Sequence, residues 1–159
     1  GFQALIKLGL LPYGKIIDMD DTMPTLTFND IARHQSKLVN TKVVSKLSPW
    51  FNKVNIGDEF VIPISHGEGK FVASEEIMKE LIKNGQIATQ YVDMEGNATY
   101  DIEYNPNGSV YAVEGITSKD GRILGKMGHS ERSYRTDILT NVPGNKDQKI
   151  FESGVEYYK

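Results

Sequence analysis

The spacing of apolar residues predicts two helices. Over residues 1–10 apolar side chains recur near every 3.6 positions, and Gly9, with Pro12 shortly after it, suits a helix end. Residues 74–85 show the same period, with Ser74 as an N-cap, acidic residues in the first turn and a terminal Asn-Gly pair. The buried face of this second helix is predicted to consist of Ile77, Leu81 and Ile82.

Other stretches are rich in Val, Ile, Thr and aromatic residues, which predicts strands separated by turns. The Asp120-Gly121 pair between two such stretches is a strong hairpin signal. A Ser48-Pro49 pair suits the start of a short helix, and the C-terminal segment has a polar half followed by a helical or extended tail. The pattern predicts a mixed α/β protein in which strands outnumber helices. The predicted strands are 25–29, 37–45, 59–65, 71–73, 87–93 and 109–118.

The composition indicates a soluble globular protein of one domain. The chain has 159 residues, of which 39% are hydrophobic and 25% charged. Lys and Arg number 18 against 21 Asp and Glu, a net charge of −3 that leaves no basic excess for nucleic acid. No apolar run approaches the roughly 20 residues of a membrane span, and the N-terminus carries no cleavable signal pattern. We therefore expect neither nucleic acid nor a membrane as a partner.

The segment KMGHSERSY, residues 126–134, carries a histidine and a carboxylate two positions apart. If the segment is extended, the side chains of His129 and Glu131 point to the same side, about 6–7 Å apart along the strand. The carboxylate then reaches Nδ1 of the imidazole and holds the tautomer whose Nε2 faces outward as a general base. The alternative is a surface histidine in a glycine turn, and the pair alone does not decide between the two.

The chain contains no cysteine. This excludes a disulfide framework, a cysteine nucleophile and a thiolate metal site within these residues, and it fits a cytoplasmic protein. A general base at His129 therefore needs a nucleophile of another kind, or one from elsewhere.

A second loop, SHGEGK, follows a predicted strand and would present backbone N–H groups to a small pocket. Its spacing is not that of a phosphate-binding P-loop. His66 and Glu68 from this loop could join His129 and Glu131 as ligands of one zinc or iron ion. Neither pair has the helical histidine spacing, so we predict no metal site. The three aspartates of residues 18–24 could also bind a metal, but we interpret this segment as a solvated loop.

Four blocks of the sequence together resemble one family: GFQALIKLGLLP, VIPISHGEGKFVA, YNPNGSVYAVEGITSKDGRILGKMGHSER and NVPGNKDQKIFESGVEYY. In this order they closely resemble the C-terminal glutamine amidotransferase domain of phosphoribosylformylglycinamidine synthase, in the large single-chain form used in purine biosynthesis. The resemblance covers nearly the whole chain. It implies that residues 1–159 are the C-terminal part of a single class I (triad) amidotransferase domain. The implied fold is a partial flavodoxin-like α/β fold, with a mixed sheet flanked by helices and hairpin strands near the C-terminus.

The resemblance also implies roles for individual residues. The family's nucleophile is a cysteine on an elbow of pattern G-x-C-N-G-F-Q, whose last three letters match Gly1, Phe2 and Gln3. The cysteine would then lie two positions before Gly1, so the chain is expected to be truncated just after it. His129 and Glu131 match the family's base and its orienting carboxylate. The implied substrate-binding residues are Gly1, Phe2, Gln3, Ser65 and His66.

The family's reaction is glutamine hydrolysis through a glutamyl thioester, and the released ammonia serves a distant synthetase site. That site uses ATP and magnesium to amidate formylglycinamide ribonucleotide, so the parent enzyme is a carbon–nitrogen ligase. The resemblance implies no cofactor in these 159 residues, and its implied partners are glutamine and the rest of the synthetase polypeptide.

The sequence departs from the family where the elbow strand, the cysteine and the synthetase portion are missing. Many relatives have proline where this chain has Ser130 between the base and its carboxylate, which should leave the pair's geometry intact. We expect these residues alone to be inactive. Either they self-associate or pair with the missing half through an uncovered face, or they are a trimmed part of a longer polypeptide. The alternative function is a non-catalytic binding or interaction module that kept the amidotransferase fold.

Overall fold

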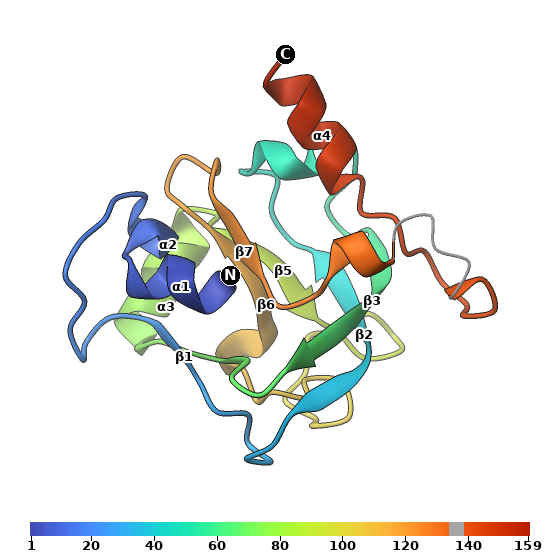
Figure 1. The fold of residues 1–159 in the computed structure, drawn as a ribbon, viewed down its shortest axis with the longest axis horizontal. Helices are drawn as coiled ribbons and strands as arrows, with labels where there is room; N and C mark the ends of the chain where they lie inside the picture. The colour runs from blue at the N-terminus through green and yellow to red at the C-terminus, as the bar shows by residue number, and fades with distance from the viewer. Residues whose placement is uncertain (134–138) are drawn as a thin grey trace.

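The computed structural model describes residues 1–133 and 139–159 and shows an antiparallel sheet with helices around it (Figure 1). Five strands form this sheet in the order β3-β2-β5-β6-β7, and β1 pairs with β4 in a separate two-stranded sheet. The strands are β1 Thr25–Thr27, β2 Gln35–Val43, β3 Glu59–His66, β4 Lys70–Val72, β5 Ile87–Tyr91, β6 Val113–Thr117 and β7 Leu124–Lys126.

The helices lie at two places around the sheet. In Figure 1 the first three α-helices lie on the left of the sheet, and the C-terminal helix lies at the upper right. None of the helices in the described part of the chain is long and apolar enough to cross a membrane. The α-helices are α1 Phe2–Lys7, α2 Leu10–Tyr13, α3 Glu75–Lys83 and α4 Ile150–Tyr157, and the 3-10 helices are η1 Pro49–Phe51, η2 Val110–Ala112 and η3 Ser130–Arg132.

The predicted α/β class is confirmed, as are the hairpin strands near the C-terminus. β6 and β7 pair around the turn at Gly121, whose φ of 74° suits glycine. The flavodoxin-like resemblance implied parallel neighbours, whereas every pairing between the described strands is antiparallel. A parallel pair needs a crossover connection, and the longest helix, α3, joins strands that belong to different sheets.

The two predicted helices form as α1 and α3, and one predicted buried position is wrong. Ser74 Oγ accepts a hydrogen bond from the backbone N–H of Ile77, as expected of an N-cap. Met78 and Leu81 are buried, but Ile82 is 52% exposed. Ile77 and Ile82 lie on opposite borders of the apolar stripe, and the core packs against the Ile77 side.

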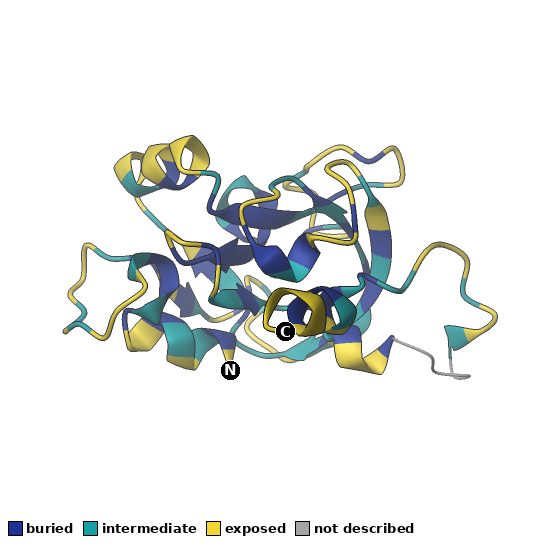
Figure 2. Ribbon diagram, turned by 90° about the horizontal axis from the view of Figure 1, so that it is seen from above, coloured by how far each residue is buried: buried dark blue, intermediate teal, exposed yellow. Residues whose placement is uncertain are grey.

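Two clusters of buried side chains hold the helices on the sheet. The first joins α1 and α3 to β6, and the second joins η1 and the start of α4 to β2 and β3. Figure 2 shows that buried residues follow the strands, while the outer faces of the helices are exposed. The first cluster anchors α1 through Phe2 and Ile6, so the start of the chain is fixed against the sheet. Burying such a side chain contributes about 1.5–3 kcal/mol.

Candidate active site

His129 and Glu131 form a hydrogen-bonded pair at the turn that follows β7. Nδ1 of His129 lies 2.7 Å from Oε1 of Glu131. The extended segment expected from the sequence is not what brings them together, because His129 is the N-cap of η3 and Glu131 lies within it. If Nδ1 carries the proton in this bond, the neutral ring keeps its lone pair on Nε2, the arrangement that a general base needs.

The carboxyl group of Glu131 is biased toward its charged form. Partial burial acts to raise its pKa, but the hydrogen bond from His129, a backbone N–H and the nearby charges of His129 and Arg132 outweigh that effect. The pKa of Glu131 therefore lies below its ordinary value. A charged carboxylate at this position favours the protonated imidazole that forms when the base accepts a proton.

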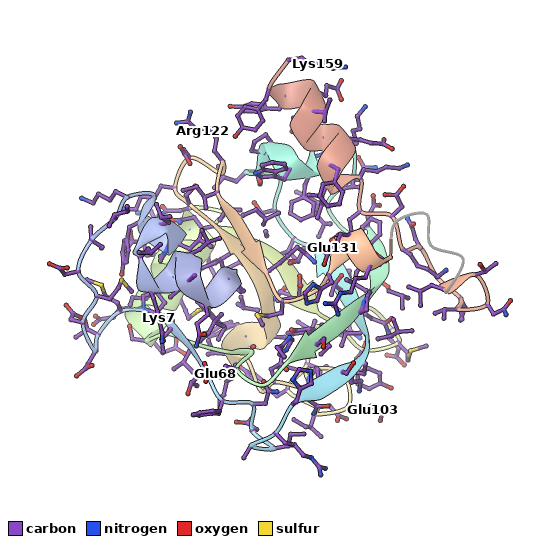
Figure 3. All side chains as sticks on the ribbon, in the orientation of Figure 1. Lys7, Glu68, Glu103, Arg122, Glu131 and Lys159 are labelled. Atoms are coloured by element: carbon purple, nitrogen blue, oxygen red, sulfur yellow. The ribbon has the colours of Figure 1, made fainter. Side chains whose placement is uncertain are left out.

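A pocket of about 1050 Å³ lies beside this pair. Its lining includes the start of α1, the end of β3 with the loop after it, and the chain from β7 into η3. Glu68 and Glu131, labelled in Figure 3, mark the two loops. The structure thus places all of the site residues predicted from the sequence around one pocket: Gly1, Phe2, Gln3, Ser65, His66, His129 and Glu131.

The Gln3 amide makes a contact within the site that the sequence does not suggest. Its Nε2 donates a hydrogen bond to Oε2 of Glu68, which also lines the pocket. From the sequence, Glu68 is a candidate only as a metal ligand. Its place in the glycine-rich loop after β3 was the available signal for a position at the pocket.

His66 is held by a buried chain of polar side chains. Its Nε2 lies 2.8 Å from Oδ1 of Asn107, and Nδ2 of Asn107 donates to the hydroxyl of Tyr91 at 2.8 Å. Because Oδ1 of Asn107 is an acceptor, Nε2 of His66 carries the proton and Nδ1 is left as a buried acceptor without a partner. Burial lowers the pKa of His66, and the hydrogen bond with Asn107 opposes this only in part.

The two histidines of the pocket therefore differ in which ring nitrogen is hydrogen-bonded. Nε2 of His66 is bonded inside the protein, whereas the hydrogen bond of His129 is made by Nδ1, and none is recorded for its Nε2 within residues 1–133 and 139–159. Asn107 and Tyr91 are fully buried and were not singled out from the sequence. Ser65 contacts a third histidine, with its Oγ 3.0 Å from Nε2 of His34.

The shared metal site considered from the sequence has no ligand set in the structure. Within residues 1–133 and 139–159 no group of three or more His, Asp or Glu side chains comes together as metal ligands would. Each of the four side chains concerned has its own hydrogen-bond partner instead. In the aspartate-rich loop, Asp20 accepts hydrogen bonds from the backbone and hydroxyl of Thr22, as in an ordinary exposed turn.

Comparison with known proteins identifies the family. Residues 1–158 match the CobB/CobQ-like glutamine amidotransferase domain. This chain belongs to that family. The predicted amidotransferase membership is thereby confirmed.

The similar proteins carry the synthase name that the resemblance indicated. Phosphoribosylformylglycinamidine synthase subunit PurQ of Aquifex aeolicus is 37% identical over 144 residues, 91% of this chain and 57% of that protein. The PurQ subunit of Methanosarcina acetivorans is 35% identical over 157 residues, 99% of this chain and 60% of that protein. The chain thus spans less than two thirds of these relatives' length.

A solved structure supports the same fold. The structure of PurLQS from Thermotoga maritima has a TM-score of 0.70 with this chain at 26% sequence identity. The match covers 100% of this chain and 59% of the other. The class I amidotransferase fold implied by the sequence is therefore confirmed.

Proposed function

We propose that this chain is the part of a phosphoribosylformylglycinamidine synthase glutaminase site that carries the general base. The observation that carries the proposal is the 2.7 Å contact between His129 Nδ1 and Glu131 Oε1 at a pocket bordered by the start of α1. The family match and the names of the relatives support it.

The nucleophile of the proposed reaction is a cysteine outside these residues, since the 159 residues contain none. The resemblance puts it two positions before Gly1, which borders the same pocket as His129. Nε2 of His129 takes the thiol proton, and the thiolate attacks the amide carbon of glutamine. The tetrahedral intermediate collapses to a thioester as His129 returns the proton to the leaving ammonia. A water molecule, deprotonated by the same nitrogen, then hydrolyses the thioester to glutamate.

The residues across the pocket have proposed roles in holding glutamine. Gly1 and Gln3 supply polar groups at the start of α1, and Phe2 packs that start against the core. Ser65 and His66 bring polar atoms from the end of β3. Glu131 holds the base in the productive tautomer and stabilises the imidazolium.

The whole protein is proposed to be the large single-chain synthase, although the similar relatives are named as subunits. In it, ammonia from this site amidates formylglycinamide ribonucleotide at a synthetase site that uses ATP and magnesium. The proposed partners are glutamine and the rest of the synthetase, and the proposed location is the cytoplasm. These 159 residues alone are proposed to be inactive, with an uncovered face that associates with a second copy or with the missing part.

The test is a glutaminase assay on the complete protein that contains these residues. We expect the wild-type protein to release glutamate from glutamine, and the substitution His129→Ala to lower kcat by about 10²-fold or more. The 159-residue chain assayed alone should release none above a blank. A complete protein without a cysteine upstream of Gly1, or with full activity after His129→Ala, would overturn the proposal.

The absence of cysteine from these residues also favours one second candidate, a non-catalytic module that kept the fold. The sequence immediately upstream of Gly1 separates the two. A Cys-Asn pair there supports the glutaminase, and a stop or an unrelated sequence supports the module.

A further inference from the structure

A fully buried carboxylate lies behind the candidate base, outside the pocket. Glu114 is on β6 and has 0% exposure. Its Oε2 accepts a hydrogen bond from the hydroxyl of Thr89, and its Oε1 accepts one from the backbone N–H of Gly128 at 2.6 Å. Glu114 does not line the pocket, so it has no route to a substrate.

A lysine completes this arrangement from β7. Nζ of Lys126 lies 3.2 Å from Oε1 of Glu114, and its side chain is only 10% exposed. The same Nζ donates a hydrogen bond to the carbonyl oxygen of Gly128 at 2.9 Å. Glu114 and Lys126 therefore hold the N–H and the carbonyl of the residue that immediately precedes His129.

The peptide immediately before the base is also hydrogen-bonded to β3. The N–H of His129 donates to the carbonyl of Pro63 on β3 at 2.8 Å, so the peptide between Gly128 and His129 is held at both of its polar groups. There is no room for a side chain at position 128. A Cβ there would lie 2.7 Å from Cγ2 of Ile62 and 2.9 Å from Oε1 of Glu114.

Stability alone does not account for a buried ion pair at this place. Desolvation of two charges offsets most of their attraction, so well-packed apolar residues of similar volume often stabilise a fold equally well. What an apolar pair lacks is a hydrogen-bond acceptor for the Gly128 N–H and a donor for its carbonyl. The contacts of this ion pair therefore indicate that it serves to fix the backbone geometry of the segment around Gly128.

We propose that Glu114, together with Lys126, is a positioning residue that fixes the Gly128 peptide and thereby sets the direction of the His129 imidazole toward the pocket. This role rests on the proposed glutaminase function. Glu114 acts through the backbone and not on the substrate, so its loss should impair the chemical step more than the binding of glutamine.

The test compares two substitutions in the complete protein. Glu114→Leu removes the acceptor for the Gly128 N–H, and we expect kcat to fall at least about tenfold with KM within about twofold of wild type. Glu114→Gln keeps an oxygen at the same place, and kcat should return to within about threefold of wild type. Lys42→Met breaks the ion pair with Glu59, away from the pocket, and serves as the matched control with wild-type kinetics.

A second readout does not depend on glutaminase activity. Hydrogen–deuterium exchange of the peptide that contains Gly128 and His129 should be about tenfold faster in Glu114→Leu, and unchanged in Glu114→Gln and Lys42→Met. If Glu114→Leu fails to fold, Lys126→Met tests the same segment by removing the donor to the Gly128 carbonyl. Because Lys126 also lines the pocket, the deciding measurement for that variant is the exchange of the same peptide, which should be at least about fivefold faster than in wild type. Wild-type exchange in Lys126→Met would overturn the role of the lysine.

The outcomes separate this inference from the proposed function. Wild-type kcat in folded Glu114→Leu, equal losses in the Leu and Gln variants, or a change in KM alone would overturn the positioning role. A wild-type protein that releases no glutamate would overturn the proposed function, and the exchange measurement would then still decide whether Glu114 fixes the segment before His129.

Discussion

The imidazole of His129 is 2.7 Å from the carboxylate of Glu131, and one short 3-10 turn provides both side chains. The turn begins directly after a segment that is hydrogen-bonded to β3 and β6. The pair therefore has a fixed place relative to the sheet, while its own geometry depends on three consecutive residues. This separation allows substitutions to test the pair and its support independently.

Substitution of Glu131 tests the pair itself. Glu131→Ala removes the acceptor for Nδ1 and the negative charge beside the imidazolium, so we expect kcat for glutamine hydrolysis in the complete protein to fall about 10²-fold or more. KM should change little. The matched control is Glu103→Ala, a loss of the same exposed side chain far from the pocket lining. Equal activity of the two variants would contradict the assigned role.

Substitution of Asn107 tests the contact between this residue and His66. Burial lowers that pKa, and a carboxylate in place of the Asn107 amide would favour the imidazolium, so Asn107→Asp should raise it. NMR titration of the His66 ring in the 159-residue chain measures the shift. Asn84→Asp, the same change at the end of α3, serves as the control. A pKa that stays the same or falls in Asn107→Asp would show that the contact with residue 107 is not the relevant one.

The stability contributed by the β6–β7 hairpin should decrease at acidic pH. Hydrogen bonds from Ser118 and then Arg122 lower the pKa of Asp120 to about 2 from 3.8. Because the folded-state pKa is the lower one, the stabilising contribution is complete above pH 3.8 and is lost as the pH falls to about 2. Asp120→Asn should therefore destabilise the chain at pH 5 and have a much smaller effect near pH 2.

The fluorescence of Trp50 is suited to that measurement. It is the one tryptophan of the chain, and its Nε1 donates to the carbonyl of Arg122 within the hairpin at 2.7 Å. Urea unfolding at the two pH values gives the comparison. Asp18→Asn removes the same charge from an exposed loop and provides the reference. A constant difference between Asp120→Asn and wild type at both pH values would exclude the carboxylate as its source.

Close packing of α1 on β7 requires glycine at position 125. A Cβ there would lie 2.4 Å from Cδ1 of Leu11 and 2.4 Å from Cδ2 of Phe2, both buried. Gly125→Ala should lower the free energy of unfolding by about 1–3 kcal/mol. Gly67→Ala places the same methyl group where no atom lies within 4 Å, and its effect should be small. Thermal or urea unfolding checks both, and equal stabilities would contradict the packing shown here.

Local signals in the sequence were sufficient for α1, α3, the hairpin and the His129–Glu131 pair, whereas the tail that forms α4 was predicted only as helical or extended. Capping at Ser74 and the Asp120-Gly121 turn act over a few residues, so they can be recognised without knowledge of the fold. The order of the strands could not be obtained this way, because β2 lies between β3 and β5 through contacts between distant residues. The same limit explains the error at Ile82, since the side of α3 that meets the core is decided by its neighbours.

The buried polar residues behind the site could not be predicted from the sequence for a related reason. Glu114 is the one charged residue of β6, and a charged side chain in a strand normally faces solvent. Its burial follows from what packs over that face of the sheet, including Lys126 and Gly128. Asn107 looked like an ordinary turn residue, yet it joins His66 to Tyr91. Such polar partners are set by tertiary packing and carry no periodic signature.

The bond between Gln3 and Glu68 has a consequence for ligand exchange. One of the two N–H groups of the Gln3 side-chain amide donates to the carboxylate of Glu68. A ligand that accepts a single hydrogen bond can use the second N–H group while Glu68 stays in place, whereas a ligand that needs both N–H groups must displace the carboxylate. Glu68 therefore competes with a ligand for one of these two donors, which favours ligands that offer a single acceptor oxygen at this point.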